Sequence, residues 1–166
     1  PSVVDPAVVA TIGKTEYATL QEAIDAAKSG DVITLQDDLT LDNEGLRFKG
    51  PKDSTPDKWK KITLNADNHS LTLNGLGIYA TYCEVTITKC RALTVNAGTN
   101  PGGTNGENSN ISAVFFCPGT LTLDNCKTVN ITNVEPNTDG GSGLCIYNGG
   151  DLYIQNNTHF TVSGFM

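Results

Sequence analysis

The sequence predicts an all-β fold built by stacking copies of one short unit, and three observations lead to this prediction. First, an eleven-residue pattern occurs three times without a gap, as VTITKCRALTV at 85–95, LTLDNCKTVNI at 121–131 and LYIQNNTHFTV at 152–162. Second, each copy holds two apolar-polar-apolar triplets separated by turn-type residues, as expected for strand, turn and strand. Third, the copies recur at a spacing of about 20 to 50 residues, which is typical of solenoids and propellers.

The superposition predicts which residues face inward together. Four apolar columns run through the copies: Val85, Leu121, Leu152; Ile87, Leu123, Ile154; Leu93, Val129, Phe160; and Val95, Ile131, Val162. A third strand precedes the two triplets, because SAVFF at 112–116 superposes on SGLCI at 142–146. Three short strands in a unit of about 30 residues favour one coil of a parallel β-helix, since a propeller blade needs four antiparallel strands and about 40 to 50 residues.

A turn column lies between the triplets, and it holds Cys90, Cys126 and Asn157. Paired strands lie about 4.8 Å apart, so equivalent turn residues of adjacent coils are predicted to stack. The two cysteines then form either a coil-to-coil disulfide or a reduced ladder in the core, and both alternatives stay open. The chain has five cysteines, so at least one thiol is free. A zinc site is not expected, because there is no CxxC motif and the two histidines are far apart in the chain.

The front of the chain departs from the period-two pattern. Residues 18–35 read ATLQEAIDAAKSGDVITL, in which Thr19 and Glu22 have the spacing of a capping box and Gly30 is expected to end a helix. The apolar stripe of this helix is Leu20, Ala23, Ile24 and Ala27. A helix with one apolar face suits the open end of a solenoid, which it would cover as a lid. Residues 8–12, VVATI, are expected to form a strand beside it.

Length and charge limit the classes of protein. The 166 residues are the size of one domain, predicted as 1–166, with the N-terminal strand and capping helix in 1–30 and the coils in 31–166. The net charge of −7, from 11 Lys and Arg against 18 Asp and Glu, gives no electrostatic support for nucleic acid or anionic membranes as partners. No run of about 18 apolar residues is present that would suggest a membrane span.

The segment IGKTEYATLQEAIDAAKSGDVITLQDDLTL at 12–41 resembles the opening of right-handed parallel β-helix domains of the pectate-lyase-like superfamily. The form it resembles is common in large surface proteins of Gram-positive and gut bacteria. The resemblance covers residues 8–41 specifically and the coils to 166 generically. It implies an all-β, right-handed parallel β-helix solenoid of about four to five coils with a short N-terminal capping α-helix. It also implies a secreted, extracellular or cell-surface module that presents a surface and often has no chemistry.

Enzymes of this superfamily cut or bind acidic polysaccharides, and one fragment is similar to their motifs. PNTDG at 136–140 matches the opening of the polygalacturonase motif set. Inverting hydrolysis needs an acid and a base, yet the Asp-Asp, Gly-His-Gly and Arg-x-Lys motifs of those enzymes do not follow in this sequence. Pro, Asn, Asp and Gly are ordinary turn residues. A turn is therefore favoured, and no catalytic residue is assigned.

A metal site is a hypothesis for the densest acidic group, which consists of Asp37, Asp38, Asp42 and Glu44. Lyases of the superfamily hold calcium with several carboxylates, and oxygen ligands at this spacing suit calcium. The alternative is that these residues are solvated turn residues beside the alternating segment 39–41. No other cofactor is expected.

Ligand contacts are predicted in the long connections between strands. NAGTNPGGTNGENSN at 96–110 and EPNTDGGSG at 135–143 leave the units at the same corner, and insertions on one face of a solenoid are commonly its binding face. Asn105, Asn108, Asn137 and Asp139 are the candidate ligand-binding residues there. Trp59, in the run KWKK, is a further candidate that either stacks on a sugar ring or packs over its loop.

These patterns predict a non-catalytic, surface-exposed module for adhesion or presentation, with weak carbohydrate binding. Its partner would be a glycan or another host or cell-surface ligand. One alternative is a fragment of a polysaccharide lyase or glycoside hydrolase, and another is a structural stalk or filament subunit. The repeats end at 152–162 with no lid after them in this sequence. End-to-end self-association through this C-terminal coil is therefore expected.

Overall fold

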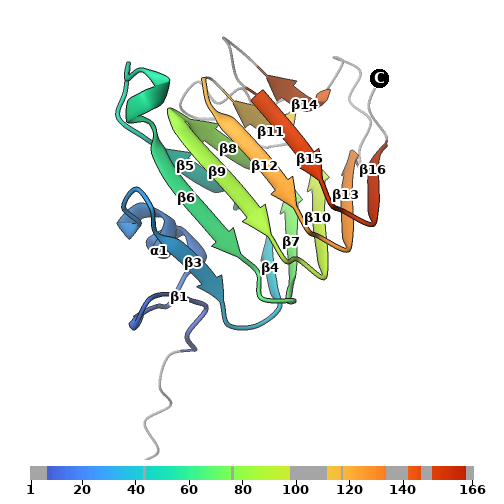
Figure 1. Ribbon diagram of the computed structural model, residues 1–166. Coiled ribbons are helices and arrows are strands. Elements are labelled where there is room, and N and C mark those ends of the chain that lie inside the picture. The colour runs from blue at the N-terminus through green and yellow to red at the C-terminus, as the bar shows by residue number, and fades with distance from the viewer. Residues whose placement is uncertain are drawn as a thin grey trace, which may run out of the picture.

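The computed structural model describes residues 7–42, 44–75, 77–97, 112–116, 118–133, 142–146 and 151–163. Most of these residues lie in β-strands arranged in parallel sheets, with one α-helix in this part of the chain (Figure 1). The helix α1 spans Leu20–Ala26, and a short 3-10 helix, η1, spans Pro56–Lys58.

The strands form three sheets. Sheet A contains β1 (Ala10–Ile12), β2 (Thr15–Tyr17), β3 (Val32–Leu35), β6 (Lys60–Asn65), β9 (Cys83–Thr88), β12 (Thr120–Asp124) and β15 (Asp151–Gln155). Sheet B contains β4 (Leu39–Asp42), β7 (Ser70–Gly75), β10 (Ala92–Ala97), β13 (Thr128–Asn133) and β16 (His159–Ser163). Sheet C contains β5 (Leu46–Lys49), β8 (Ile78–Thr81), β11 (Ser112–Phe116) and β14 (Ser142–Ile146).

From β3 onward, consecutive strands enter sheets A, B and C in turn. Each strand from β3 to β13 therefore pairs with the strand three places further along the chain, and all of these pairings are parallel. The predicted columns are confirmed: Leu121 pairs with Val85 on one side and with Leu152 on the other. The superposition of 112–116 on 142–146 is confirmed too, since β11 and β14 pair from Ser112 with Ser142 to Phe116 with Ile146.

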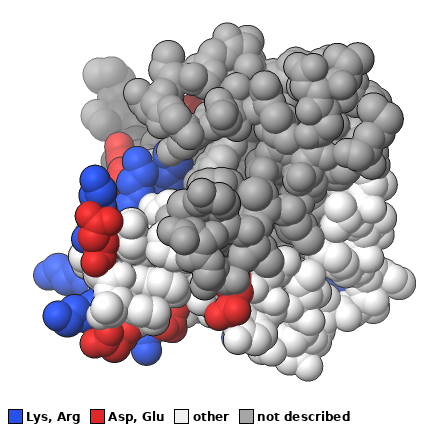
Figure 2. All heavy atoms as spheres, turned by 90° about the horizontal axis from the view of Figure 1, so that it is seen from above, with Lys and Arg blue, Asp and Glu red and all other residues white. Residues whose placement is uncertain are grey.

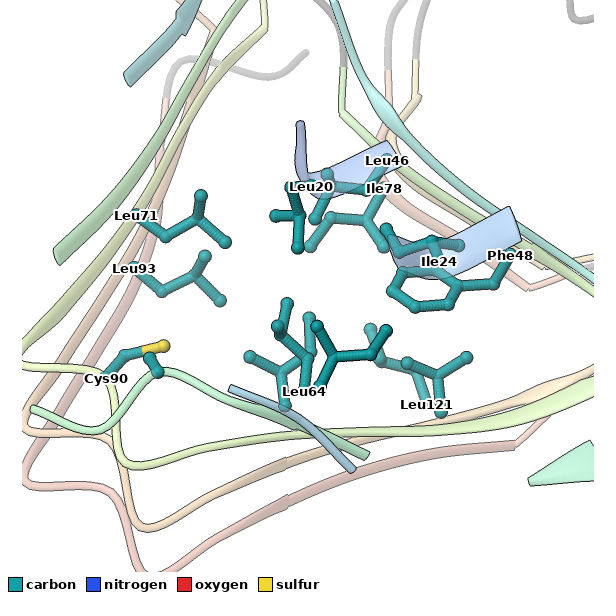
Figure 3. Close-up of a cluster of buried hydrophobic side chains, with 14 of the residues drawn as sticks. Leu20, Ile24, Leu46, Phe48, Leu64, Leu71, Ile78, Cys90, Leu93 and Leu121 are labelled. Atoms are coloured by element: carbon teal, nitrogen blue, oxygen red, sulfur yellow. The ribbon is translucent and has the colours of Figure 1, made fainter. Parts of the chain in front are cut away.

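The core lies between the three sheets, and the alternation along each strand fills it. Leu71 and Leu93 of sheet B, Leu64 and Leu121 of sheet A, and Phe48 and Ile78 of sheet C point toward one another (Figure 3). All six side chains are buried, whereas the residues on either side of Leu64, Leu71, Leu93, Leu121 and Phe48 are half-buried or exposed. Burying such apolar side chains contributes about 1.5 to 3 kcal/mol each, so these columns supply the main stabilisation of the fold.

Helix α1 covers one end of this core. The Thr19 Oγ1 accepts a hydrogen bond from the Glu22 backbone N–H at 3.1 Å, as the capping motif predicts. The whole predicted stripe of Leu20, Ala23, Ile24 and Ala27 is buried. The Gln21 side-chain amide accepts from the Arg47 N–H at 3.0 Å and donates to the Arg47 C=O at 2.9 Å. It thereby occupies the outer edge of β5 as a neighbouring strand would.

Two predictions about the front of the chain need correction. The helix does not run to Gly30, because Ala27 is already extended with ψ of 136°, and Gly30 stands in the following turn with φ of +96°. The expected strand at 8–12 begins at Ala10, and it pairs antiparallel with both β3 and β2. Strand β2 was not predicted, since a three-residue strand is too short to show alternation.

The corner between sheets A and B repeats one backbone conformation. Lys89, Asn125 and Asn156 follow β9, β12 and β15, and all three are left-handed, with φ of 57°, 54° and 57°. Asparagine tolerates this conformation better than most residues. The next residues are Cys90, Cys126 and Asn157, the predicted turn column, and both cysteines are buried.

Replacing Leu123 by Asp should lower the free energy of unfolding by more than about 4 kcal/mol, because the carboxylate would lie in an apolar core without a partner. Leu123 is fully buried between Ile87 and Ile154. Thr122→Asp, on the outward face of the same strand, is the control and should cost less than about 1 kcal/mol. Urea denaturation measures both. A Leu123→Asp protein that unfolds at the parent's midpoint would show that this face does not point inward.

Candidate functional site

Two ranks of polar side chains cover the outer face of sheet B, which we call the neutral face. They alternate with apolar residues that are buried on β7, β10 and β13, so the inward register of those residues turns the polar ones outward. Pairing of the strands sets the members of each rank side by side. The first rank is Thr40, Thr72, Thr94, Asn130 and Thr161, and the second is Asp42, Asn74, Asn96, Thr132 and Ser163.

Hydrogen bonds order the second rank. The Asn74 Nδ2 donates to the Asp42 Oδ1 at 2.8 Å, and the Asn96 Nδ2 donates to the Asn74 Oδ1 at 2.8 Å. Further along, the hydroxyls of Thr132 and Ser163 lie 3.4 Å apart. A side-chain amide has two N–H donors and an oxygen with two lone pairs, so bonds along the ladder leave capacity for a ligand. The amides are thus held in place before any ligand binds.

Charge separates the neutral face from the outer face of sheet A. Among the members of the two ranks only Asp42 carries a charge. The outer face of sheet A carries an ion pair between Lys61 and Glu84, with Nζ and Oε2 3.9 Å apart, whereas the ion pair of Asp38 and Arg91 lies in the turns just before β4 and β10. Seen from above in Figure 2, charged side chains of both signs gather on the left, where η1 and β6 lie in Figure 1. Among the described residues visible on the right side, where β13 and β16 lie, almost none is charged.

The predicted calcium ligands do not converge as a set of four. Asp37 and Asp38 lie in the turn before β4, where they group with His69, and their ligand atoms lie within 4.8 Å of one another. Asp42 is instead the first member of the amide ladder. Glu44 borders a hollow of about 400 Å³ between α1 and β4, whose lining includes Thr19, Leu39 and Leu41. In the part of the chain that the structure describes, no group of three or more ligand residues includes Asp42 or Glu44.

Asp38 is already held by partners from two other turns. Its Oδ1 accepts from the Ser70 N–H at 2.9 Å and lies 3.6 Å from the His69 Nδ1, while its Oδ2 accepts from the Arg91 guanidinium at 2.6 Å. These contacts lower the pKa of the Asp38 carboxyl below its usual value, chiefly through the Ser70 N–H and then through Arg91. A cation bound here would be repelled by the positive charge of Arg91, which disfavours calcium. Calcium binding by Asp37 and Asp38 stays a prediction.

Trp59 holds its own loop together. Its side chain is 7% exposed, and its indole Nε1 donates to the Ser54 C=O at 3.0 Å. To stack on a sugar ring the indole would have to leave this position. The packing alternative therefore describes the observed side chain, and ligand binding by Trp59 stays a prediction.

The other predicted contacts lie outside the described residues. These are Asn105, Asn108, Asn137 and Asp139, together with the PNTDG segment at 136–140. The sequence patterns do not single out the neutral face as a site. The alternation does place these residues outward, since Thr72 and Thr94 each stand between two apolar residues and Asn74 follows one. Threonine is common in strands of any function, so such residues alone do not indicate a binding site.

The chain matches no protein-family model, and no curated protein or solved structure proves significantly similar to it. Within the described ranges, no helix has the length and apolar character needed to cross a membrane. The arrangement of side chains in this structure is therefore the basis for inferring function.

Acid should remove the stabilisation that Asp38 provides. Because its pKa is lower in the folded protein than in the unfolded chain, Asp38 stabilises the fold above its usual pKa of about 3.8 and loses this effect as the pH falls through the folded value. Asp38→Asn should therefore destabilise the protein at pH 7 and narrow the difference in stability between pH 7 and pH 3.

Urea denaturation of both proteins at the two pH values measures this effect. Asp38 is exposed, so salt should weaken it. Asp67→Asn, in the neighbouring exposed turn, is the control and should keep the parent's dependence on pH. An Asp38→Asn protein with the parent's full dependence would mean that the contacts with Ser70 and Arg91 do not stabilise the fold.

Proposed function

We propose that this chain is a right-handed parallel β-helix module that binds a neutral glycan at a cell surface and catalyses no reaction. The regular entry of strands into sheets A, B and C supports the β-helix, because a chain wound as a solenoid returns to each sheet once per coil. The resemblance of 12–41 to the opening of surface-protein β-helices supports the location and the right-handed winding.

The neutral face carries the proposal of glycan binding. Its hydroxyl and amide groups both donate and accept hydrogen bonds, as sugar hydroxyls do. It has little charge, so it offers an acidic polysaccharide no counter-charge and suits an uncharged one. The pairing of β4, β7, β10, β13 and β16 extends the two ranks across five strands, which suits an extended chain of sugars.

Binding at this face should be weak. The two ranks contain no aromatic side chain that could stack on a pyranose ring. Hydrogen bonds exchanged with water give a small net free energy each. We therefore expect dissociation constants of about 0.1 to 1 mM, with avidity from several copies at a surface raising the effective affinity.

Thr94→Lys in the middle of the neutral face should abolish binding to a neutral polysaccharide, because the long charged side chain covers the first rank. Thr86→Lys, at the equivalent outward position of β9 in sheet A, is the matched control. Affinity electrophoresis through gels that contain mannan, xylan or mixed-linkage glucan measures retention. Both variants should melt within about 2 °C of the parent, since surface changes cost little.

Three outcomes decide this prediction. Retention of the parent and of Thr86→Lys but not of Thr94→Lys supports the neutral face as the glycan site. Equal retention of all three proteins would place binding elsewhere, and a parent that none of the neutral polysaccharides retards would contradict glycan binding.

An enzymatic function, as a polysaccharide lyase or glycoside hydrolase fragment, is the alternative that the group of Asp37, Asp38 and His69 favours. We prefer the non-catalytic proposal because Arg91 and Ser70 already engage Asp38. Incubation with polygalacturonate, with and without calcium, separates the two. Release of unsaturated or reducing ends that disappears in Asp38→Asn would favour the enzyme.

A filament or stalk subunit is a second candidate, favoured by apolar side chains on β15 and β16. Ile154, Phe160 and Val162 are 39%, 37% and 40% exposed although they continue the core columns. Strands β15 and β16 are also the outermost strands of sheets A and B. Open strand edges beside apolar side chains recruit further strands. We propose that the partner is a second copy of this chain. It would bind the surface formed by the strand edges of β15 and β16 and by Ile154, Phe160 and Val162, which we call the end face.

Self-association should therefore rise with protein concentration in sedimentation velocity experiments. Val162→Lys should shift the equilibrium toward the monomer, because a charged side chain at the end face would be buried in the contact. Thr161→Lys, the neighbouring outward position, should leave association unchanged. A parent protein that sediments as a monomer at every concentration would contradict association through this face.

A further inference from the structure

The corner between sheets A and B places two cysteines at the same position of neighbouring turns. The strands before the turn pair Thr88 with Asp124, and the strands after it pair Ala92 with Thr128. Cys90 and Cys126 stand midway in these turns. The Lys127 N–H also donates to the Cys90 C=O at 2.9 Å, so the two turns are joined through their backbones.

This stacking satisfies the distance requirement of a disulfide. Neighbouring paired strands lie about 4.7 to 4.9 Å apart, and disulfide-bonded residues have Cα atoms about 4.4 to 6.8 Å apart. Hydrogen bonds hold both turns in register on either side of the cysteines, so the backbone does not have to move to bring them together. What remains is rotation of the two side chains.

The two thiols are close enough to affect each other's ionisation. The interaction with Cys126, together with burial, raises the pKa of Cys90, and the interaction with Cys90 lowers the pKa of Cys126. Each side chain is 1% exposed. In Figure 3 the Cys90 sulfur points into the interior beside Leu93, at the corner where sheets A and B meet.

We propose that Cys90 and Cys126 are a modification site, at which a disulfide covalently joins two successive turns of the corner. The bond would close a loop that contains β10, β11 and β12. A crosslink of this kind restricts the unfolded chain and leaves the native backbone unchanged. It would keep the turn that contains Cys90 and the turn that contains Cys126 from separating.

The chemistry is thiol–disulfide exchange with a small disulfide such as oxidised glutathione. One cysteine thiolate attacks a glutathione sulfur, which forms a mixed disulfide and releases one glutathione thiolate. The second cysteine thiolate then attacks the protein sulfur of the mixed disulfide and releases the second glutathione thiolate. Two protein thiols are oxidised to a disulfide, one glutathione disulfide is reduced to two thiols, and the two protons go to solvent or to the released thiolates.

Burial determines when this reaction takes place. Both thiols lie within the core of the folded protein, so a small disulfide reaches them while the chain folds and only slowly afterwards. The same burial protects the finished bond from reductants. The disulfide is thus expected to form on folding in an oxidising solution and then to persist.

Cys83 provides a matched comparison within the chain. Its side chain is also buried, and burial raises the pKa of its thiol to about 12. Its register partner on one side is Lys60, and the pairing of Glu84 with Thr120 places Gly119 opposite it on the other side. Cys83 therefore has no stacked cysteine, and it should remain a free thiol under the same conditions.

The experiment is to unfold the full chain in denaturant with reductant and to refold it in mixtures of reduced and oxidised glutathione. Peptide mapping by mass spectrometry, after alkylation of free thiols, identifies which cysteines are joined. We expect a peptide that links Cys90 to Cys126, alkylated Cys83, and a melting temperature about 5 to 15 °C above that of the reduced protein. The linked form should survive incubation with reduced glutathione at neutral pH.

Variants separate this pair from the other thiols. In a background with Cys117→Ser and Cys145→Ala, the linked peptide and the increase in melting temperature should persist. They should vanish with Cys126→Ala and remain with Cys83→Ala. The absence of a Cys90–Cys126 peptide at every ratio would overturn the proposal, as would a linked protein that melts no higher than the reduced one. Mapping of the unaltered chain tests the site even where a variant does not fold.

Discussion

In-register parallel pairing of every third strand is the constraint on which the rest of the structure depends. Because Val85, Leu121 and Leu152 occupy one line across sheet A, a single choice of register decides the side of every residue on β9, β12 and β15. A shift by one residue would turn the apolar column outward and bury Thr86 and Thr122 instead. The cost of burying those hydroxyls without partners fixes the register.

Parallel pairing of this kind leaves the first parallel strand of each sheet, β3, β4 and β5, with an unpaired outer edge. The chain satisfies two of these edges in different ways. At sheet A, β1 pairs antiparallel with β3 and satisfies its edge with backbone groups. At sheet C, the amide of Gln21 makes the two bonds to Arg47 that a neighbouring strand would make. At sheet B, no described strand pairs with the outer edge of β4, and a hollow of about 400 Å³ lies between this strand and α1.

Repetition explains how much the sequence could predict. The columns, the third strand and the buried stripe of α1 could be predicted from periodic spacing. The spacing of apolar residues directly indicates which face of a strand or helix is buried. Contacts between turns do not follow in this way. Asp38 and Arg91 are 53 positions apart and meet only because turns of different composition stack. Acidic residues close in sequence were therefore expected to act together, although Asp42 and Glu44 belong to other surroundings.

The position and hydrogen bonding of a single side chain depend on all the residues around it, and a sequence pattern does not show these residues. The sequence left open whether Trp59 stacks on a ligand or packs over its loop, and in the structure its indole N–H has a partner within its own loop at Ser54. Gly30 suggested a helix end, yet Ala27 leaves the helix earlier, and its N–H still bonds to the carbonyl groups of Ala23 and Ile24. In both cases local hydrogen bonds decided a position that residue type alone left open.

The corner column shows what sulfur does in place of an amide. Asn157 accepts from the Cys126 N–H at 2.7 Å and donates to the Leu123 C=O at 2.9 Å, so it satisfies two backbone groups of the preceding turn. The Cys126 sulfur lies at the equivalent place one turn earlier, 3.9 Å from the C=O of Ile87, the residue that pairs with Leu123. A thiol is a weak donor and a weak acceptor. Asparagine at this place would bond the backbone more strongly, so hydrogen bonding does not account for two successive cysteines in the column. A disulfide between Cys90 and Cys126 would compensate for the weaker hydrogen bonding of the two thiols, because a covalent bond joins adjacent turns more firmly than asparagine hydrogen bonds at these positions would.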